Sequence, residues 1–373
     1  MNEFQFRRFK SLARRRRLPA ITLLLAAIIL SVSAVLASAP TRSPARQSSP
    51  CPRQSGQPYS SQAFLSCSGE WVATRLSTET DALTMVPGSP EKLYAGTVNG
   101  VRLSQDGGKT WTQVPGPLGT QSVMSFASEP VSTQLFAGSD TGGVYQLSAN
   151  HSQQWQRVGS PSRGAPIFAL AASPHGGDVV LAGSIGGIFR GTRTGSTWQW
   201  QQVARTGDSS VPAITWAPWN PHQVFASVFG TSPAVLASSD DGRTWHPYGA
   251  GLPATLPAET LLPLRADSSV MLTTMGAGVW VLHANGIWHD VSAGLPQRHA
   301  MPAIDDATAK AQFAGTMGYG VYVRQQANAW RRLGHRLAGT EYTVLSLILT
   351  SGPEPQLFAG TARGLFRFSL NGK

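Results

Sequence analysis

The stretch Ser104-Gln105-Asp106-Gly107-Gly108-Lys109-Thr110-Trp111 returns almost unchanged as Ser238-Ser239-Asp240-Asp241-Gly242-Arg243-Thr244-Trp245. Both copies follow the pattern S-x-D-x-G-x-T-W. The aspartate can accept hydrogen bonds from the N–H groups of a turn, the glycine can adopt a positive φ, and Thr-Trp favours a β-strand. The pattern therefore predicts a tight turn that joins two strands.

A second landmark shows that the turn belongs to a repeat. It consists of apolar residues followed by one small residue, and it occurs seven times at intervals of 42 to 46 residues. The small residues are Gly96, Gly138, Gly183, Ser227, Thr273, Gly315 and Gly360. A repeat of this length predicts one four-stranded propeller blade per unit. Degraded copies of the turn lose the aspartate but keep the tryptophan and part of the remaining motif, at Trp155, Trp198 (or its neighbour Trp200), Trp288 and Trp330.

The two ends of the repeat array complement each other. Trp71 starts a strand of the outermost type without the three strands that should precede it, whereas the last repeat ends after strands at 343–349, 356–361 and 365–368. Pairing residues 71–75 with that last repeat would leave no half-blade with unpaired backbone groups. We therefore expect an all-β fold, a single seven-bladed propeller over residues 71–373 closed by its N-terminal strand.

These motifs carry a family resemblance. The two turns are identified as Asp-boxes of BNR type, and the chain resembles the single seven-bladed propellers of the photosystem II assembly factor family and, more distantly, the ten-bladed sortilin propellers. The resemblance implies a non-catalytic scaffold that binds or assembles a protein partner. The chain departs from the assembly factors because it has no lipid-attachment cysteine motif and keeps only two intact boxes, so no photosynthetic role is expected.

Charge and hydropathy predict where in the cell the region before the propeller lies. The formal net charge is +11, but residues 1–17 alone carry seven Arg/Lys against Glu3, and from Trp71 onward only +3 remains. This distribution argues against a nucleic-acid-binding face. The uncharged residues 18–39 could span about 33 Å as a helix, and the basic segment before them should stay in the cytoplasm.

Two outcomes remain for this N-terminal region. Residues 18–39 act as an uncleaved transmembrane signal anchor that leaves the propeller on the extracytoplasmic side, or they are removed after Ala37-Ser38-Ala39 and the protein is secreted. Residues 40–70 read as a Ser/Pro-rich tether. They contain the only two cysteines, Cys51 and Cys67, for which export predicts a disulfide.

We expect the Asp-boxes to be structural. Their turns join the two outer strands of a blade, roughly 10 to 14 Å from the innermost strand at a spacing of about 4.8 Å per strand. The tryptophan should hold blades together and the aspartate should fix the turn, so Trp111→Ala should cost more stability than Asp106→Ala. The structural set comprises Ser104, Asp106, Gly108, Thr110, Trp111, Ser238, Asp240, Gly242, Thr244 and Trp245.

Catalytic signals are weak. The acidic residues near the ends of the innermost strands read as turn caps or loop ends rather than as the carboxylate pair of a glycosidase. They are Asp81, Glu259, Asp305, Asp306 and Glu341. The eight histidines show no metal-site spacing, so neither a metal nor a cofactor is expected. A glycoside hydrolase or glycan-binding lectin that uses the channel mouth is the alternative.

The predicted partner-binding face is formed by loops at one end of the ring. Loops between the second and third strands, and between successive blades, should project there, where propellers commonly bind. A protein partner and a monomeric state are expected. The candidate residues are Asn99, Asp140, Phe229, Arg298, His299, Tyr319 and Arg363.

Overall fold

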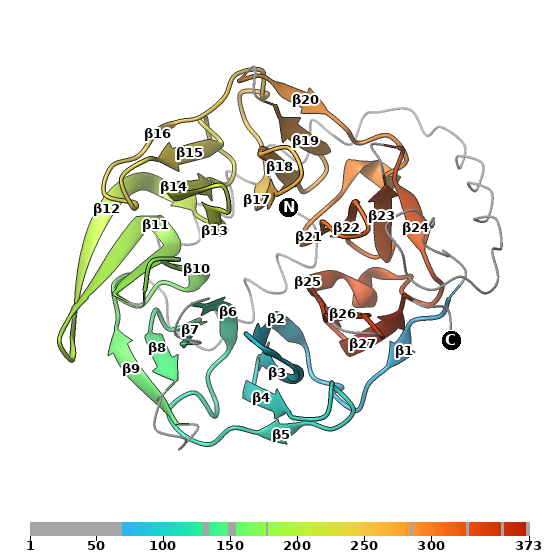
Figure 1. Cartoon of the computed structure of the whole chain (residues 1–373), viewed down its shortest axis with the longest axis horizontal. Coiled ribbons are helices and arrows are strands. Elements are labelled where there is room, and N and C mark those ends of the chain that lie inside the picture. Colours follow the sequence, from blue (N-terminus) through green and yellow to red (C-terminus); the bar gives the residue numbers. More distant parts are fainter. Residues whose placement is uncertain are drawn as a thin grey trace, which may run out of the picture. The chain divides into compact units, whose positions relative to one another are not determined.

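Seven antiparallel sheets surround a common channel in the computed structural model (Figure 1). The structure describes residues 69–129, 134–147, 154–176, 178–283, 286–325, 328–351 and 354–370. The predicted segments 1–17 and 18–39, nearly all of the tether 40–70, and both cysteines lie outside these ranges. None of the helices within them has the length and hydrophobicity of a membrane crossing. The only helical turns described are η1 (Pro296–Arg298) and η2 (Thr340–Tyr342), both 3₁₀.

The strands of each blade are lettered A to D from the channel outward. Blade one contains β2 (Thr80–Val86), β3 (Ser89–Thr97), β4 (Gly100–Ser104) and β5 (Thr112–Gln113). Blade two contains β6 (Val123–Ser128), β7 (Leu135–Ser139), β8 (Val144–Leu147) and β9 (Trp155–Gly159). Blade three contains β10 (Ile167–Ala172), β11 (Val179–Thr194) and β12 (Thr197–Ser210). Blade four contains β13 (Ala213–Ala217), β14 (Asn220–Ser227), β15 (Val235–Ser238) and β16 (His246–Pro247).

The remaining blades complete the ring. Blade five contains β17 (Ala258–Leu264), β18 (Ser269–Thr274), β19 (Val279–Leu282) and β20 (Trp288–Asp290). Blade six contains β21 (Ala303–Asp306), β22 (Ala311–Gly315), β23 (Val321–Gln325) and β24 (Arg331–Leu333). Blade seven contains β25 (Val344–Leu349), β26 (Gln356–Thr361), β27 (Gly364–Ser369) and β1 (Val72–Ala73).

The predicted closure of the ring is confirmed. Strand β1 pairs antiparallel with β27, with Val72 opposite Arg367 and Ala73 opposite Phe366. The Trp71 ring packs against Phe368 at 5.3 Å between centroids. Strand A of blade seven, β25, also contacts strand A of blade one, β2, as every other neighbouring pair of A strands does. One sheet therefore joins both ends of the array.

Blade three has three assigned strands because β11 doubles back on itself. The N–H of Arg193 donates to the Asp178 carbonyl across 2.8 Å, and between them Gly186 and Gly187 adopt positive φ. The first half of β11 pairs with β10 and the second half with β12, as strands B and C do elsewhere. The long hairpin of β11 and β12 projects beyond the other blades (Figure 1).

The repeated small residue is explained by the contact between blades. A Cβ added at Gly96 would lie 2.7 Å from the Val123 carbonyl oxygen, which belongs to strand A of the next blade. Where the anchor is Ser227, its hydroxyl donates to the Glu259 carbonyl of the next blade across 2.8 Å. Strand B is buried on both faces, so the anchor must be tiny or must satisfy its own polar atom.

Tryptophans of the degraded repeats hold neighbouring blades together. Four tryptophans donate the indole N–H to a backbone carbonyl in or beside the D strand of the preceding blade, an arrangement that we call the tryptophan clamp. Trp155 of blade two does not, and its Nε1 has no hydrogen-bond partner among the described residues. The clamps are Trp71 to Leu333 (2.9 Å), Trp200 to Val158 (3.0 Å), Trp288 to Tyr248 (3.4 Å) and Trp330 to Val291 (2.9 Å). In blade three the clamp is made by Trp200 rather than by Trp198.

The tryptophans of the two intact Asp-boxes hold blades together by packing and not by the clamp. Trp111 donates to Gly108 across 3.2 Å and Trp245 to Gly242 across 3.1 Å, each within its own hairpin. Their half-buried rings pack against cores shared with the preceding blade, which include Phe358 of blade seven and Leu181 of blade three. The clamp is therefore absent between blades seven and one and between blades three and four, and it is also absent between blades one and two.

Candidate functional site

The Asp-box side chains are engaged within their turns. Asp106 Oδ1 accepts from the N–H groups of Lys109 and Thr110 at 3.0 and 2.9 Å, and Oδ2 accepts from the Thr110 hydroxyl at 2.5 Å. Ser104 donates its hydroxyl to Asp106 and accepts from the Gly108 N–H. These bonds, led by the one from the Thr110 hydroxyl, hold the pKa of Asp106 far below its usual range. The carboxylate is therefore committed to its turn.

The second box repeats this arrangement. Asp240 accepts from the N–H groups of Arg243 and Thr244 at 3.0 and 2.9 Å and from the Thr244 hydroxyl at 2.7 Å. Ser238 bridges Asp240 and the Gly242 N–H. Burial opposes ionisation of Asp240, but the hydrogen bonds prevail and its pKa lies far below the usual range.

The glycine of each box lies against the neighbouring blade. A Cβ on Gly108 would approach the Phe358 ring to 2.6 Å, and one on Gly242 would approach Leu181 to 2.7 Å. Both glycines also have positive φ, 82° and 75°. The pattern thus needs glycine for backbone conformation and for space.

The seven predicted partner-binding residues all lie in loops at one end of the channel. This end, where the B–C turns and D–A loops meet, is called the BC mouth, and the opposite end with the A–B and C–D turns is called the AB mouth. Asn99, Arg298 and Arg363 are exposed, and the other four are half-buried. The backbone N–H groups of Asn99 and Arg363 donate to Thr97 and Thr361 within their own turns. Asp140, Phe229 and Tyr319 occupy B–C turns of blades two, four and six.

Two of these residues form contacts within their own blade. Arg298 donates to the Asp290 carboxylate at 2.7 Å and to the Ala277 carbonyl at 3.1 Å, which ties a D–A loop to a B–C turn. The ring of His299 packs close to Gly276, and burial lowers the pKa of this histidine. Arg298 and His299 therefore stabilise loops at the BC mouth as well as facing it.

Two cavities lie at the AB mouth, where the sequence predicted no site. One cavity of about 490 Å³ is lined by the ends of A strands in blades two to four, including Trp216, and by Arg265 from blade five. Three prolines, Pro174, Pro218 and Pro221, form part of its wall. A second cavity of about 420 Å³ lies among blades seven, one and two, and Ser128 lines both. These volumes fall in the range of ligand pockets.

Trp216 contributes apolar surface to the larger cavity. Its indole Nε1 is buried and has no hydrogen-bond partner among the described residues. Because that nitrogen is inaccessible, Trp216 faces the cavity with other atoms of its side chain. The ring therefore acts as part of an apolar wall rather than as a hydrogen-bond donor.

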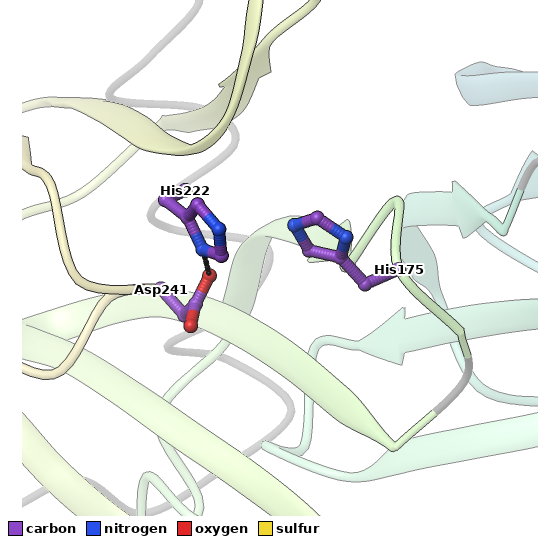
Figure 2. A group of neighbouring side chains, drawn as sticks. All are labelled: His175, His222 and Asp241. Carbon is purple, nitrogen blue, oxygen red and sulfur yellow. Dashed lines mark hydrogen bonds and ion pairs between the residues drawn. The ribbon is translucent and has the colours of Figure 1, made fainter.

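A cluster of His175, His222 and Asp241 lies near the same cavity (Figure 2). His222 Nδ1 is 2.9 Å from Asp241 Oδ1, and the two imidazole rings stack at 4.8 Å between centroids. Burial opposes ionisation of Asp241, but bonds from His222 and Arg243 keep its pKa below the usual value. This cluster was not predicted from the sequence, although a Pro-His pair close to the A–B connection of two successive blades, Pro174-His175 and Pro221-His222, was a visible signal.

The acidic residues considered for glycosidase chemistry are divided between the two mouths. Asp81, Glu259 and Glu341 lie at or near the starts of A strands in blades one, five and seven, facing the BC mouth. Asp305 and Asp306 end strand β21 at the AB mouth. Asp306 accepts from the N–H groups of Thr308 and Ala309, as a turn cap does. Burial raises the pKa of Asp305, partly offset by a bond from Gln312.

Comparison with known proteins identifies the fold. No family model and no curated protein matches the chain. The GH74 xyloglucanase of Xanthomonas campestris matches with a TM-score of 0.62 and 17% identity, covering 80% of this chain and 53% of the enzyme. The GH74 enzyme of Niastella koreensis matches with a TM-score of 0.63 and 15% identity, covering 82% and 54%. The chain thus spans about half the length of these enzymes.

A third match covers nearly the whole length of the other protein. The structure of YCF48 bound to D1 peptide matches with a TM-score of 0.60 and 14% identity, and the match covers 80% of this chain and 96% of YCF48. At such identities the likeness concerns architecture alone. The chain is a seven-bladed β-propeller whose structural neighbours include YCF48 and the GH74 propellers, which confirms the resemblance at the level of the fold.

Proposed function

We propose that this propeller is a non-catalytic scaffold that binds an extended segment of a protein partner at the AB mouth. The observation that carries the proposal is a cavity of about 490 Å³ whose wall includes the ring of Trp216 and three prolines. The prolines of the wall offer apolar surface to the side chains of a peptide, and the exposed Arg265 favours an acidic residue.

The comparison with YCF48 supports a peptide as the ligand. That protein is a propeller matched over nearly its whole length, and its structure contains a bound peptide. The single ring of this chain has the same extent, whereas the GH74 enzymes are about twice as long. We carry over the class of ligand only, because the identity is too low to transfer a partner or a contact residue.

A photo-crosslinking experiment on the full chain in its native membranes tests the proposal. A benzophenone amino acid at Ser128, which lines both cavities, should give a discrete protein adduct, and the same group at Asn99 on the BC mouth should not. Trp216→Ala removes apolar surface from the wall, and Arg265→Glu reverses the charge, so each should reduce the adduct several-fold. Trp280→Ala is the matched control, because this half-buried tryptophan is not among the residues that line the cavity.

The outcomes show at which mouth of the propeller the partner binds. An adduct from Asn99 or Tyr319 with none from Ser128 would move the partner to the BC mouth and reject the cavity as its site. An absence of adducts from both mouths would reject the scaffold function itself.

The membrane location forms part of the same proposal. Residues 18–39 would hold the propeller on the extracytoplasmic side, supported by the uncharged run and the basic segment before it. Protease added to intact cells should then remove the propeller while the mature protein retains its N-terminus. A mature protein that begins near Pro40 would instead show cleavage and secretion.

Glycan chemistry is the second candidate, favoured by the GH74 neighbours and by the acidic residues at the BC mouth. Hydrolysis of xyloglucan by the purified chain, abolished in Asp81→Asn or Glu341→Gln, would establish it. Undiminished hydrolysis in both variants would trace the activity to other residues or to a contaminant.

A further inference from the structure

The contact between blades three and four is built differently from its neighbours. Clamps join blades two and three through Trp200 and blades four and five through Trp288. Trp245 of blade four instead bonds within its own Asp-box. In place of a clamp, Arg190 Nε of blade three donates to the Asp241 carbonyl of blade four across 3.0 Å, and His175 of blade three stacks on His222 of blade four.

Two turns and the start of a strand bring the cluster together (Figure 2). His175 lies in the A–B turn of blade three, His222 near the start of strand B of blade four (β14), and Asp241 in the C–D turn of blade four. The backbone of Asp241 is fixed on both sides, because its N–H donates to the His222 carbonyl at 3.2 Å and its own carbonyl accepts from Arg190. Both imidazoles are exposed and can adjust, whereas the carboxylate is partly buried.

The donor atoms suit a borderline divalent ion. One ligand atom from each residue falls within a set whose members all lie within 4.8 Å of one another. Two ligands of a tetrahedral zinc ion, each about 2.05 Å from the metal, are separated by about 3.3 Å. The contact of 2.9 Å between His222 Nδ1 and Asp241 Oδ1 is close to that separation, so an ion can replace the shared proton with a small shift. His175 has to approach by a rotation of its exposed side chain.

We propose that His175, His222 and Asp241 bind a zinc-class divalent cation that links blades three and four where the tryptophan clamp is missing. Imidazole nitrogens and a carboxylate oxygen are the ligands that such ions prefer. Arg243 donates to Asp241 Oδ2 at 3.0 Å, which leaves Oδ1 as the ligating oxygen and holds the carboxylate in place. The fourth position remains open to water or to a ligand of the adjacent cavity, whose wall includes Pro174 and Pro221.

A second pair of neighbouring histidines in the same chain serves as a control for histidines that lie together by chance. His283 and His289 of blade five have ring centroids 5.5 Å apart, and both are exposed. They are not part of a three-ligand group among the described residues. A site that depends on the carboxylate and on the blade contact should therefore bind at the first pair and not at the second.

Zinc binding to the full chain tests the proposal, in a Cys51→Ser, Cys67→Ser background so that thiolates do not compete. Competition with a chromophoric chelator should show one Zn²⁺ per chain. His175→Gln, His222→Gln and Asp241→Asn should each weaken binding at least ~10-fold. His283→Gln and His289→Gln should bind as the parent does. Zn²⁺ should raise the unfolding temperature of the parent, but not of His222→Gln.

A spectroscopic readout makes the test independent of affinity. With Cu²⁺ as the probe, pulsed electron paramagnetic resonance should detect two coordinated imidazoles in the parent and one in His175→Gln. Unfolding in chelator must be unchanged in that variant, which shows that the fold is intact. No zinc binding by the parent, binding unaffected by the His175 and His222 variants, or loss confined to the His283 and His289 variants would overturn the proposal.

Discussion

At the scale of the residue, the Asp-box is a small self-contained network. One serine hydroxyl and two carboxylate oxygens satisfy the donors of a turn that contains two or more residues with positive φ. Asp106 accepts three hydrogen bonds from Lys109 and Thr110 and a fourth from Ser104. Its ionised form is therefore favoured in the folded state, and folding stability depends on pH through this group.

The pH dependence of Asp106→Asn follows from the sign of that shift. A carboxylate whose pKa is depressed on folding contributes stability above its unfolded pKa, near 4, and loses the contribution as pH falls toward its folded pKa. The parent should thus be more stable than Asp106→Asn at pH 7, and the difference should narrow below about pH 4. Urea unfolding at several pH values measures it. A difference independent of pH would show that the charge of Asp106 does not matter.

Sequence alone predicted what these residues do locally, but not their surroundings. Spacing identified both turns, since the pattern is contiguous. It could not show that Gly108 faces Phe358 or that Asp241 meets His175, because those partners are many residues away and their distance depends on the ring. The repeated Pro-His pairs were the one hint, and only the contact between blades gives them meaning.

At the scale of the element, strand B and strand D explain the repeat. Strand B must pass between two blades, so its anchor is Gly96 in one repeat and a hydroxyl residue such as Ser227 in another. The tryptophan lies at or beside strand D, and its indole bond stays within the hairpin in the two intact boxes but reaches the preceding blade in four others. The bounds of strands B and C of blade seven were predicted to within one residue, because apolar residues and turn glycines mark them clearly.

Trp71→Ala should reduce the free energy of unfolding more than Trp111→Ala does, because the two tryptophans make different contacts. Trp71 is 1% exposed and bonds to blade six, so its loss should cost about 3 to 5 kcal/mol. Trp111 is partly exposed and bonds within its turn, so about 1 to 2 kcal/mol is expected. Denaturant unfolding of both variants provides the comparison. A larger loss for Trp111 would refute the clamp as the stronger contact.

At the scale of the whole molecule, closure is the feature that sequence predicted most fully. A lone D-type strand at one end and three strands at the other admit one economical arrangement, and β1 pairs with β27 as that arrangement requires. The hollows at the AB mouth were not predictable in the same way. Their walls combine residues from several blades, which no local pattern brings together.

A disulfide across the closing pair should lock the ring. Val72 and Arg367 face each other, so Val72→Cys with Arg367→Cys, in a chain without Cys51 and Cys67, should oxidise readily. The bond encloses nearly the entire propeller and should stabilise it by up to about 6 kcal/mol in the chain-entropy model. Thermal unfolding of the oxidised and reduced forms measures the gain. Equal unfolding temperatures would mean that β1 leaves the sheet before the ring opens.

Blade seven contains strands from both ends of the repeat array, so it cannot form until the last strand has been synthesised. During synthesis β1 leaves the ribosome before any other strand, yet its partner β27 is made last, after six blades have had time to form. The side chain of Trp71 therefore stays exposed to solvent until the strands that cover it have been synthesised. An open-ended stack of blades is the obligatory precursor, and the interval before its two edges meet is when it is most exposed to pairing with another copy of itself.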